Sequence, residues 1–202
     1  MKKPAKVGSG ADGADIRAFI AIELPEEVKV FLREISNRLS SSGGDVSWTR
    51  PEGIHLTLKF LGNITPRLVT DLGNGLGSIF AAQPPFRLRV EGIGTFPDQR
   101  RPRVIWAGLK DPQGALEPLA AKVEDVTASL GLARENRRYN PHLTLGRVRS
   151  SEGCSRLMHL ITDLRDLQGP SFVADRAALF QSILKPTGAQ YTALIRFATS
   201  SA

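Results

Sequence analysis

The sequence contains a single cysteine, Cys154, and no long apolar run. One cysteine excludes a disulfide within the chain and is typical of a protein from a reducing compartment. No apolar stretch approaches the roughly 20 residues that a membrane-spanning helix needs. The chain starts with basic residues (Lys2, Lys3, Lys6) that lead into Gly, Ala and Asp rather than into the apolar core of a signal peptide. We therefore expect a soluble cytoplasmic protein with no membrane partner.

The sequence also lacks the usual motifs of nucleotide-binding and serine-dependent enzymes. It has no Walker loop, and no Gly-x-Gly-x-x-Gly run joins a predicted strand to a helix. A Gly-x-Ser-x-Gly elbow is missing as well, and a Ser-His-Asp triad uses only one histidine. These absences direct attention to the three histidines.

The composition is that of an ordinary globular protein with an excess of positive charge. Of 202 residues, 41% are apolar and 23% are charged, which is enough to bury a substantial core in one domain or in two similar lobes. The chain has 27 basic and 20 acidic residues, a net charge of +7. Such a charge favours polyanionic partners, including nucleic acids and nucleotides, but says nothing about the fold.

Two of the three histidines stand in the same tetrapeptide. His-Leu-Thr-Leu begins at His55 and again at His142. In a β-strand, successive side chains point to opposite faces, so His55 would lie beside Thr57, and His142 beside Thr144, while the leucines point to the other face. The repeat predicts two proton-transfer groups, each with a hydroxyl donor, that face a shared anion.

The pattern along the chain predicts an α+β fold with largely antiparallel sheets. Helices and strands are interspersed without regular βαβ alternation. The 54–61 strand is expected to close at Gly62-Asn63, and 94–97 to form a turn. The second helix is the least regular, because it contains three glycines. The expected strands are 17–24, 46–49, 54–61, 86–92, 103–109, 141–147, 171–184 and 190–198, and the expected helices are 25–39, 65–80, 116–130 and 153–164.

The domain organisation follows from the same pattern. Residues 1–15 are small, polar and rich in glycine, which indicates a disordered tail. The remaining residues, 16–202, are expected to form a single domain. Because the tetrapeptide recurs in the two halves of this domain, we expect it to consist of two related lobes.

Metal binding is the first alternative to acid–base chemistry at the histidines. Zinc sites normally take at least three protein ligands, and here the supply is His55, His142 and His159 with no cysteine pair. His159 lies on a predicted amphipathic helix outside any motif, where a surface or packing role is expected. We therefore predict no metal and no other cofactor.

Two histidines facing one phosphate are what acid–base cleavage of a phosphodiester requires. One neutral imidazole removes a proton from the nucleophile while one imidazolium protonates the leaving oxygen, and an unperturbed pKa of about 6.5 makes both forms accessible near neutrality. The hydroxyls of Thr57 and Thr144 can donate to the non-bridging oxygens as negative charge grows.

Several cationic and aromatic residues are candidates for substrate binding. Strand alternation places Lys59 on the face of His55 and turns Arg147 away from His142, unless a bulge at Gly146 redirects it. A solvated role is open for both. The loop before the 103–109 strand is basic, and arginine suits phosphate. The further candidates are Arg100, Arg101 and Arg103 for phosphate, and Tyr139 for stacking on a base, with Phe60, Trp48 and Trp106 more typical of a core.

The two motifs and their surroundings resemble a known family. Pro-Glu-Gly-Ile-His-Leu-Thr-Leu-Lys-Phe-Leu-Gly at 51–62 and Asn-Pro-His-Leu-Thr-Leu-Gly-Arg at 140–147 look like the paired His-x-Thr motifs of the 2H phosphoesterase superfamily. More narrowly, the chain resembles the LigT-like bacterial and archaeal RNA 2′,3′-cyclic phosphodiesterases, also called 2′-5′ RNA ligases. The resemblance extends from about residue 17 to 197 and includes 19–25, 96–97, 100–106, 182–184 and 188–192.

The resemblance implies a two-lobed fold in which each lobe gives one His-x-Thr to a central cleft. It implies hydrolysis of terminal 2′,3′-cyclic phosphates of RNA to 2′-phosphates, with His142 as general base, His55 as general acid, and Thr57 and Thr144 holding the phosphate. The expected partner is an RNA end, such as that of a tRNA fragment, bound by a monomer. Joining a 5′-hydroxyl RNA end to the 2′ position is the related reaction.

Two other functions stay open on the sequence alone. The chain can be a module that binds RNA ends or nucleotides without turning them over, although two intact histidines favour catalysis. It can also be a phosphodiesterase for a small cyclic phosphate or a 2′-5′ oligonucleotide. The basic charge favours RNA over these smaller substrates.

Overall fold

A computed structural model describes residues 14–185 and 188–200 of the chain. Residues 1–13 of the expected tail therefore lie outside the described part. The described residues form four α-helices, one short 3-10 helix and nine strands. The strands are β1 (Ile16–Ile22), β2 (Val46–Trp48), β3 (Leu56–Ile64), β4 (Phe86–Phe96), β5 (Val104–Lys110), β6 (His142–Val148), β7 (Gln168–Ala174), β8 (Arg176–Lys185) and β9 (Gly188–Ala198). The helices are α1 (Glu26–Ser40), α2 (Pro66–Ala81), α3 (Leu116–Ser129), α4 (Cys154–Asp163) and the 3-10 turn η1 (Pro51–Gly53).

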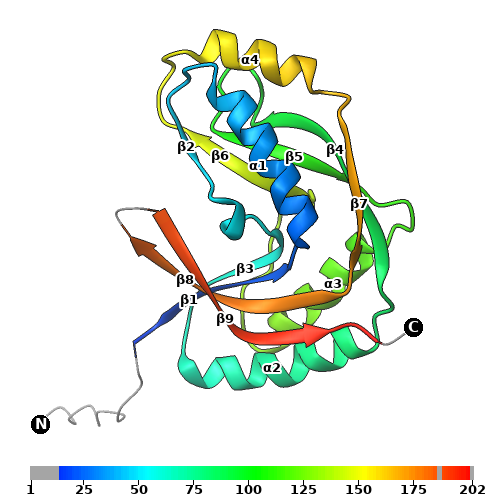
Figure 1. The fold of residues 1–202 in the computed structure, drawn as a ribbon. Coiled ribbons are helices and arrows are strands. Elements are labelled where there is room, and N and C mark those ends of the chain that lie inside the picture. The colour runs from blue at the N-terminus through cyan, green and yellow to red at the C-terminus, as the bar shows by residue number, and fades with distance from the viewer. Residues whose placement is uncertain (1–13, 186–187, 201–202) are drawn as a thin grey trace, which may run out of the picture.

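All the strands join one curled sheet, as Figure 1 shows. The strand order is β7-β4-β5-β6-β3-β1-β8-β9, and β2 pairs with the C-terminal end of β6. Each pair of strands is antiparallel. The fold is thus α+β with an antiparallel sheet, as the sequence predicts.

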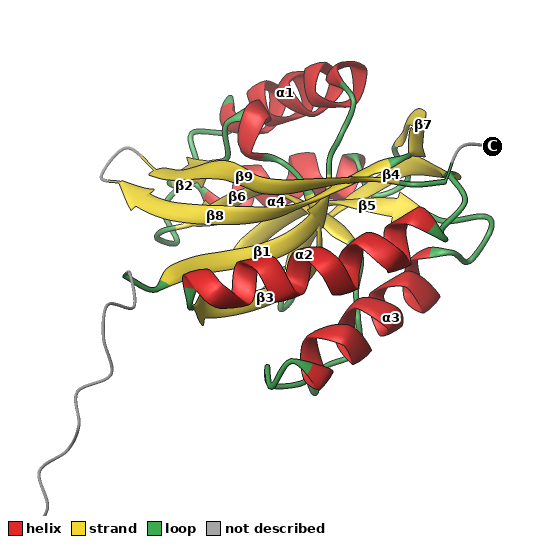
Figure 2. Ribbon diagram, turned by 90° about the horizontal axis from the view of Figure 1, so that it is seen from below, coloured by secondary structure: helices red, strands yellow, loops and turns green. Residues whose placement is uncertain are grey.

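The sheet divides into two halves of similar build at the β3–β6 contact. In the first lobe, helices α2 and α3 pack on β9 and β3 and on each other. In the second lobe, α1 and α4 pack on β7 and β4. Figure 2 shows α1 and the α2–α3 pair on opposite sides of the strands.

The chain crosses between the lobes more than once. Helix α1 follows β1 of the first lobe but packs on the second, and α3 follows β5 of the second lobe but packs on the first. Strand β7 pairs at one edge of the sheet, yet only Asp175 separates it from β8 near the other edge. Each lobe is therefore completed by chain that comes from the other.

The leucines of both tetrapeptides fill the core. Leu56, Leu143 and Leu145 are fully buried, and Leu58 is nearly so. They lie in one apolar cluster with the inward faces of the helices, such as Val28 and Leu32 of α1. Burial of the leucines holds the histidines and threonines on the opposite face.

Two of the three glycines of α2 have a packing role. A Cβ on Gly73 would lie 2.7 Å from Ile195 Cδ1 of β9, and a Cβ on Gly75 would lie 2.8 Å from Val126 Cγ1 of α3. Thr65 caps the helix by accepting from the Leu68 N–H. Close approach of α2 to β9 and α3 therefore explains why Gly73 and Gly75 are present, although glycine lowers helix propensity.

Three expected boundaries were wrong. Strand β3 does not close at Gly62-Asn63 but runs on to Ile64, still paired with β1. The expected turn at 94–97 is part of the eleven-residue β4, where Gly94 makes room for the Trp106 ring. The expected strand 171–184 is two strands that pair with different lobes. In the part of the chain described, no helix is long and apolar enough to cross a membrane.

Candidate active site

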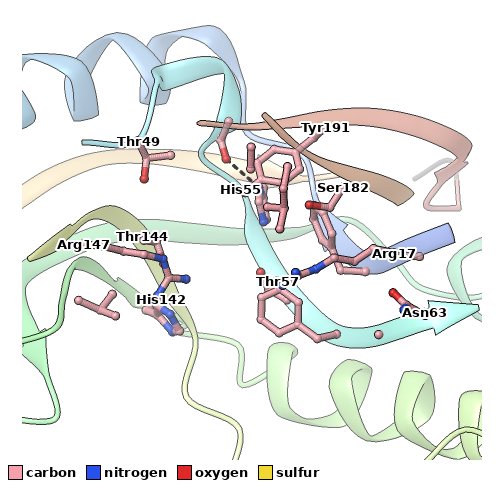
Figure 3. Close-up of a pocket in the computed structure, with 18 of the residues that line it drawn as sticks. Arg17, Thr49, His55, Thr57, Asn63, His142, Thr144, Arg147, Ser182 and Tyr191 are labelled. Carbon is pink, nitrogen blue, oxygen red and sulfur yellow. Dashed lines mark hydrogen bonds between the residues drawn. The ribbon is translucent and has the colours of Figure 1, made fainter. Parts of the chain in front are cut away.

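A cleft of about 850 Å³ lies between the two lobes. Residues from β1, β3, β8 and β9 line one side, and residues from β4, β5 and β6 line the other. Figure 3 shows His55 and Thr57 facing His142 and Thr144 across it. The structure thus brings together the four residues that the repeat singles out.

Pairing of the two motif strands places the motifs opposite one another. Leu56 and Leu143, the second residues of the two tetrapeptides, are direct partners in the antiparallel β3–β6 pair. Because the two strands run antiparallel, His55 and His142, each one residue before its leucine, lie on opposite sides of this contact. Each lobe supplies one copy, and the cleft forms where the copies meet.

Each histidine is held in the same way. The Nδ1 of His55 lies 2.8 Å from the Gly53 carbonyl oxygen, and the Nδ1 of His142 lies 2.8 Å from the Asn140 carbonyl oxygen. Because a carbonyl oxygen can only accept, Nδ1 donates and carries the proton in both rings. In the neutral rings the Nε2 lone pair is then left for the cleft.

His55 is enclosed by aromatic rings. It stacks on Phe19 with centroids 4.5 Å apart and meets the edge of Tyr191 at 5.0 Å. Burial in this apolar surrounding lowers the pKa of His55 to about 4, and the hydrogen bond to Gly53 and the nearby His142 are smaller influences of opposite sign. His55 is therefore neutral at neutral pH in the free protein.

His142 has a more open environment. Its ring meets the edge of Phe96 at 5.0 Å, and its hydrogen bond to Asn140 lies at the surface. The two imidazoles thus share a tether and a cleft but differ in burial. Burial disfavours the charged form of an imidazole, so the enclosure of His55 favours its neutral form.

A β-bulge follows each His-x-Thr at the same position. Lys59 and Thr57 pair with the adjacent residues Ile20 and Ala21, so Leu58 is extra in β3. Gly146 and Thr144 pair with the adjacent residues Ile105 and Trp106, so Leu145 is extra in β6. A bulge reverses the face on which all later residues point.

The bulge in β6 directs Arg147 into the cleft. Arg147 is exposed and lines the cleft together with His142 and Thr144. Gly146 allows the bulge to lie against β2, because a Cβ there would come within 2.7 Å of Val46 Cγ1. The sequence allowed for a bulge at Gly146, and the register of β6 places it one residue earlier, at Leu145.

The bulge in β3 turns Lys59 away from the cleft. Strand alternation predicts Lys59 on the face of His55, and this is wrong because Leu58 and Lys59 are both buried. The ammonium group forms an ion pair with Glu124 of α3 and donates to the Ala133 carbonyl at 2.9 Å. Lys59 therefore joins α3 to β3 beneath the cleft, and Phe60 takes the place on the cleft side.

Tyr139 also lies outside the cleft lining. Its ring packs against the core, and its hydroxyl donates to the Thr57 carbonyl at 3.1 Å. Burial raises the pKa of Tyr139 well above its usual value, with a smaller contribution from Asp111. Tyr139 thus contacts the backbone of the catalytic strand, an arrangement that differs from the expected stacking on a base.

The basic loop residues occupy a second hollow. Arg100, Arg101 and Arg103 line a groove of about 640 Å³ beside the cleft, and Arg147 lines both. They are exposed. The position of these three arginines beside the cleft is compatible with the expected phosphate contacts. Of the four predicted arginines, only Arg147 also lines the cleft that holds His55 and His142.

Other cleft residues were not predicted as site residues. Figure 3 shows Arg17, Thr49, Asn63, Ser182 and Tyr191 around the cleft, the first from β1 and the last two from the β8–β9 pair. The signal for Tyr191 and Ser182 was their place in the stretches that resemble the family. Arg17 gave no signal, because only the pairing of β1 with β3 brings it to the cleft.

No group of three His, Cys, Asp or Glu side chains that could hold a metal ion occurs within residues 14–185 and 188–200. His159 is exposed on α4 and does not line the cleft. Cys154 lies at the start of α4 in the wall of the arginine-lined groove. The ionisable side chains of the cleft are therefore the two histidines, Arg17, Arg147 and Tyr191.

Comparison with known sequences gives consistent matches. A family model described as LigT like Phosphoesterase matches residues 22–106 and 108–191. A protein named RNA 2′,3′-cyclic phosphodiesterase from Methanothermobacter thermautotrophicus is 31% identical over 177 residues, which is 88% of this chain and 95% of its own length. One of the same name from Aquifex aeolicus is 30% identical over 190 residues, which is 90% of this chain and 96% of its own.

Solved structures match over nearly the whole chain. A crystal structure from Thermus thermophilus has a TM-score of 0.75 and 27% identity, covering 91% of this chain and 97% of its own. E. coli LigT complexed with 3′-AMP has a TM-score of 0.73 and 26% identity, covering 93% of this chain and 99% of its own. The similarity therefore includes both lobes and the cleft between them.

Proposed function

This chain belongs to the LigT-like phosphoesterase family, and on that premise we propose that it hydrolyses terminal 2′,3′-cyclic phosphates of RNA to 2′-phosphates. The observation that carries the proposal is the convergence of two His-x-Thr pairs on one cleft. In each pair the imidazole is held through Nδ1, so that Nε2 can accept a proton from water or donate one to the leaving oxygen. The protein is thus a hydrolase of RNA ends.

The reaction needs two proton transfers and no cofactor. The oxygen of a water molecule forms a bond to phosphorus while Nε2 of His142 accepts the water's proton. The bond between phosphorus and O3′ breaks, and Nε2–H of protonated His55 donates to O3′. The products are a 2′-phosphate and a 3′-hydroxyl, and exchange with solvent returns the two imidazoles to their starting states.

The remaining cleft residues stabilise the phosphate. The Thr57 and Thr144 hydroxyls donate to the non-bridging oxygens, where negative charge grows in the transition state. The Arg147 guanidinium, turned in by the bulge, supplies positive charge in a fork that matches two phosphate oxygens. An RNA 5′-hydroxyl in place of water would give a 2′–5′ linkage by the same transfers.

Burial of His55 places a condition on this order of roles. In the free protein the pKa of about 4 leaves His55 without the proton that a general acid needs. An anion bound against the ring favours the imidazolium form, so the substrate itself restores the proton. Protonation of His55 is therefore part of substrate binding.

The proposal extends to the setting of the reaction. Because one chain supplies both motifs, a monomer completes the site. We place the protein in the cytoplasm, acting on RNA fragments such as those of tRNA. Light scattering of the purified protein in the presence of RNA tests the monomer directly.

Histidine variants test the function. We expect His55→Ala and His142→Ala each to lower the rate of cyclic phosphate hydrolysis by about 10²–10⁴-fold, the usual contribution of a general acid or base. The measurement incubates wild type and variants with EDTA and an RNA bearing a 2′,3′-cyclic phosphate, and identifies the product by chromatography.

The control is His159→Ala, which removes the exposed histidine of α4. It should keep the wild-type rate and product. Tight RNA binding without any product would favour a binding module instead, and hydrolysis of small cyclic phosphates but not of RNA would favour the small-molecule alternative. Loss of wild-type activity in EDTA would contradict the metal-independent mechanism.

A further inference from the structure

The arginine-lined groove adjoins the cleft at Arg147. The groove is lined by the loop 99–103 between β4 and β5, by residues 147–151 at the end of β6, and by the start of α4. Arg147 lines both hollows. A ligand that extends beyond the catalytic phosphate past Arg147 therefore enters the groove.

The groove is strongly and uniformly positive. Five arginines line it, and all five are exposed: Arg100, Arg101, Arg103, Arg147 and Arg149. No Asp or Glu belongs to its lining, and none of the five forms an ion pair within the described part of the chain. The charge of the groove is thus available to a ligand.

The loop is built so that its only carboxylate leaves the arginines unpaired. Asp98 accepts the backbone N–H groups of Arg100 and Arg101 at 2.7 and 3.0 Å, which uses its oxygen to shape the turn. The Arg103 N–H donates to the Phe96 carbonyl, and the Arg103 carbonyl accepts from Val148. These bonds fix the loop against β6 and hold it beside the groove.

We propose that this groove binds the sugar–phosphate backbone of the nucleotides that precede the terminal cyclic phosphate. The inference rests on the proposed function, because that function places the last phosphate in the cleft. A single strand carries one phosphate per nucleotide, and guanidinium groups bind phosphate through paired hydrogen bonds. The groove would make an oligonucleotide a better substrate than a mononucleotide.

Kinetics with substrates of increasing length test the proposal. The substrates are a nucleoside 2′,3′-cyclic phosphate and a hexanucleotide ending in the same group. We expect wild-type kcat/KM to be about tenfold or more higher for the hexanucleotide and to fall steeply with salt. In Arg101→Ser/Arg149→Ser this preference should largely disappear, and the slope of log kcat/KM against log salt should become shallower by about 1.4.

The matched control removes the same charge from a distant place. Arg67→Ser/Lys122→Ser changes two exposed residues of α2 and α3, on the side of the molecule away from α4 (Figure 1). This variant should keep the wild-type preference for length. An equal loss in both double variants would show a general effect of net charge and would overturn the proposal.

A second measurement does not depend on catalysis. Cys154 is the only cysteine and lies in the wall of the groove, so its reaction with a thiol reagent reports occupancy. A hexanucleotide ending in a 3′-hydroxyl should slow this reaction in wild type and in the control but not in Arg101→Ser/Arg149→Ser. A nucleoside monophosphate should leave the reaction rate unchanged.

The outcomes separate the two proposals. If wild type hydrolyses neither substrate, the proposed function fails. If it hydrolyses both with equal kcat/KM and the hexanucleotide leaves Cys154 reactive, the groove proposal alone fails. Protection of Cys154 by the mononucleotide as well would also overturn it, because the groove would then not be specific for the extended strand.

Discussion

Burial sets the charge of His55 before any substrate arrives. Phe19 and Tyr191 exclude water from the ring, and its Nδ1 is already used by Gly53. His142 has the same backbone tether but a more open surrounding. The two identical motifs thus differ in how closely neighbouring side chains enclose the imidazole.

The pKa of His55 should respond to an anion in the cleft. In the free protein we expect a value of about 4, and saturation with sulfate, which does not titrate in this range, should raise it by about 1–3 units. Sulfate should therefore bind more tightly as the pH falls through the raised pKa, and should gain nothing further below about 4. Ring proton shifts in NMR titrations with and without sulfate measure both values.

His55→Gln assigns the His55 signals in this titration, and His159 on α4 gives a reference for non-specific effects of the salt. If sulfate leaves the pKa of His55 unchanged, the ring stays neutral with an anion bound. His55 would then be the base and His142 the acid, which reverses the roles proposed above.

At the scale of elements, α2 is where local preference and packing conflict. Its three interior glycines weaken the helix, and two of them are forced by neighbours. Gly75 lies against Val126 of α3, whereas no atom lies within 4 Å of the position a Cβ would take on Gly77. The two positions therefore separate propensity from packing within one helix.

Substituting Gly75 and Gly77 by alanine should affect stability differently. We expect Gly77→Ala to raise the free energy of unfolding by about 0.5–1 kcal/mol, because alanine has the higher helix propensity. Gly75→Ala should lose that gain, since its Cβ would lie 2.8 Å from Val126 Cγ1. Urea denaturation with an unchanged m-value measures both.

Gly75→Ala/Val126→Ala tests the contact itself. Val126→Ala replaces the isopropyl group by a methyl group and removes Cγ1, so Gly75→Ala should be better tolerated in the Val126→Ala background than in wild type. If Gly75→Ala stabilises as much as Gly77→Ala does, the close packing of α2 on α3 is not what requires glycine there.

The sequence predicts the elements well but not their register. Apolar periodicity identified all four helices, and alternation placed His55 with Thr57 and His142 with Thr144 correctly on one face. Alternation failed beyond the fourth residue of each motif, because Leu58 and Leu145 are bulged. Both are ordinary buried leucines, and a bulge depends on the partner strand as much as on the residue itself.

The cleft residues that escaped prediction share one property. Arg17 of β1 and Tyr191 of β9 reach the cleft through the order of strands in the sheet, in which β1, β8 and β9 follow β3. Strand order arises from packing between distant parts of the chain, and composition or spacing carries no record of it. Resemblance to a family marked the stretch around Tyr191 but assigned it no role.

At the scale of the whole molecule, the two lobes are not independent. Helices α1 and α3 are each exchanged between lobes, and β7 continues into β8 across the sheet. The motif strands pair through Leu56 and Leu143 inside one core. We therefore expect the cleft to be a feature of a single folding unit.

Thermal unfolding should accordingly show one transition. We expect calorimetric and van't Hoff enthalpies to agree, since neither lobe can keep its core without a helix from the other. Differential scanning calorimetry, with circular dichroism as a second probe, checks this. Two resolved transitions, or a cooperatively folded fragment containing only residues 1–85, would contradict it.

The paired bulges also govern how the gene for this protein can change. A substitution in or after either His-Leu-Thr-Leu alters one side chain at a time. Gain or loss of one codon between Thr144 and Arg147 would instead exchange the faces of all later residues in β6, moving the arginine out of the cleft. Selection on these strands should therefore be far stricter against insertions and deletions than against replacements.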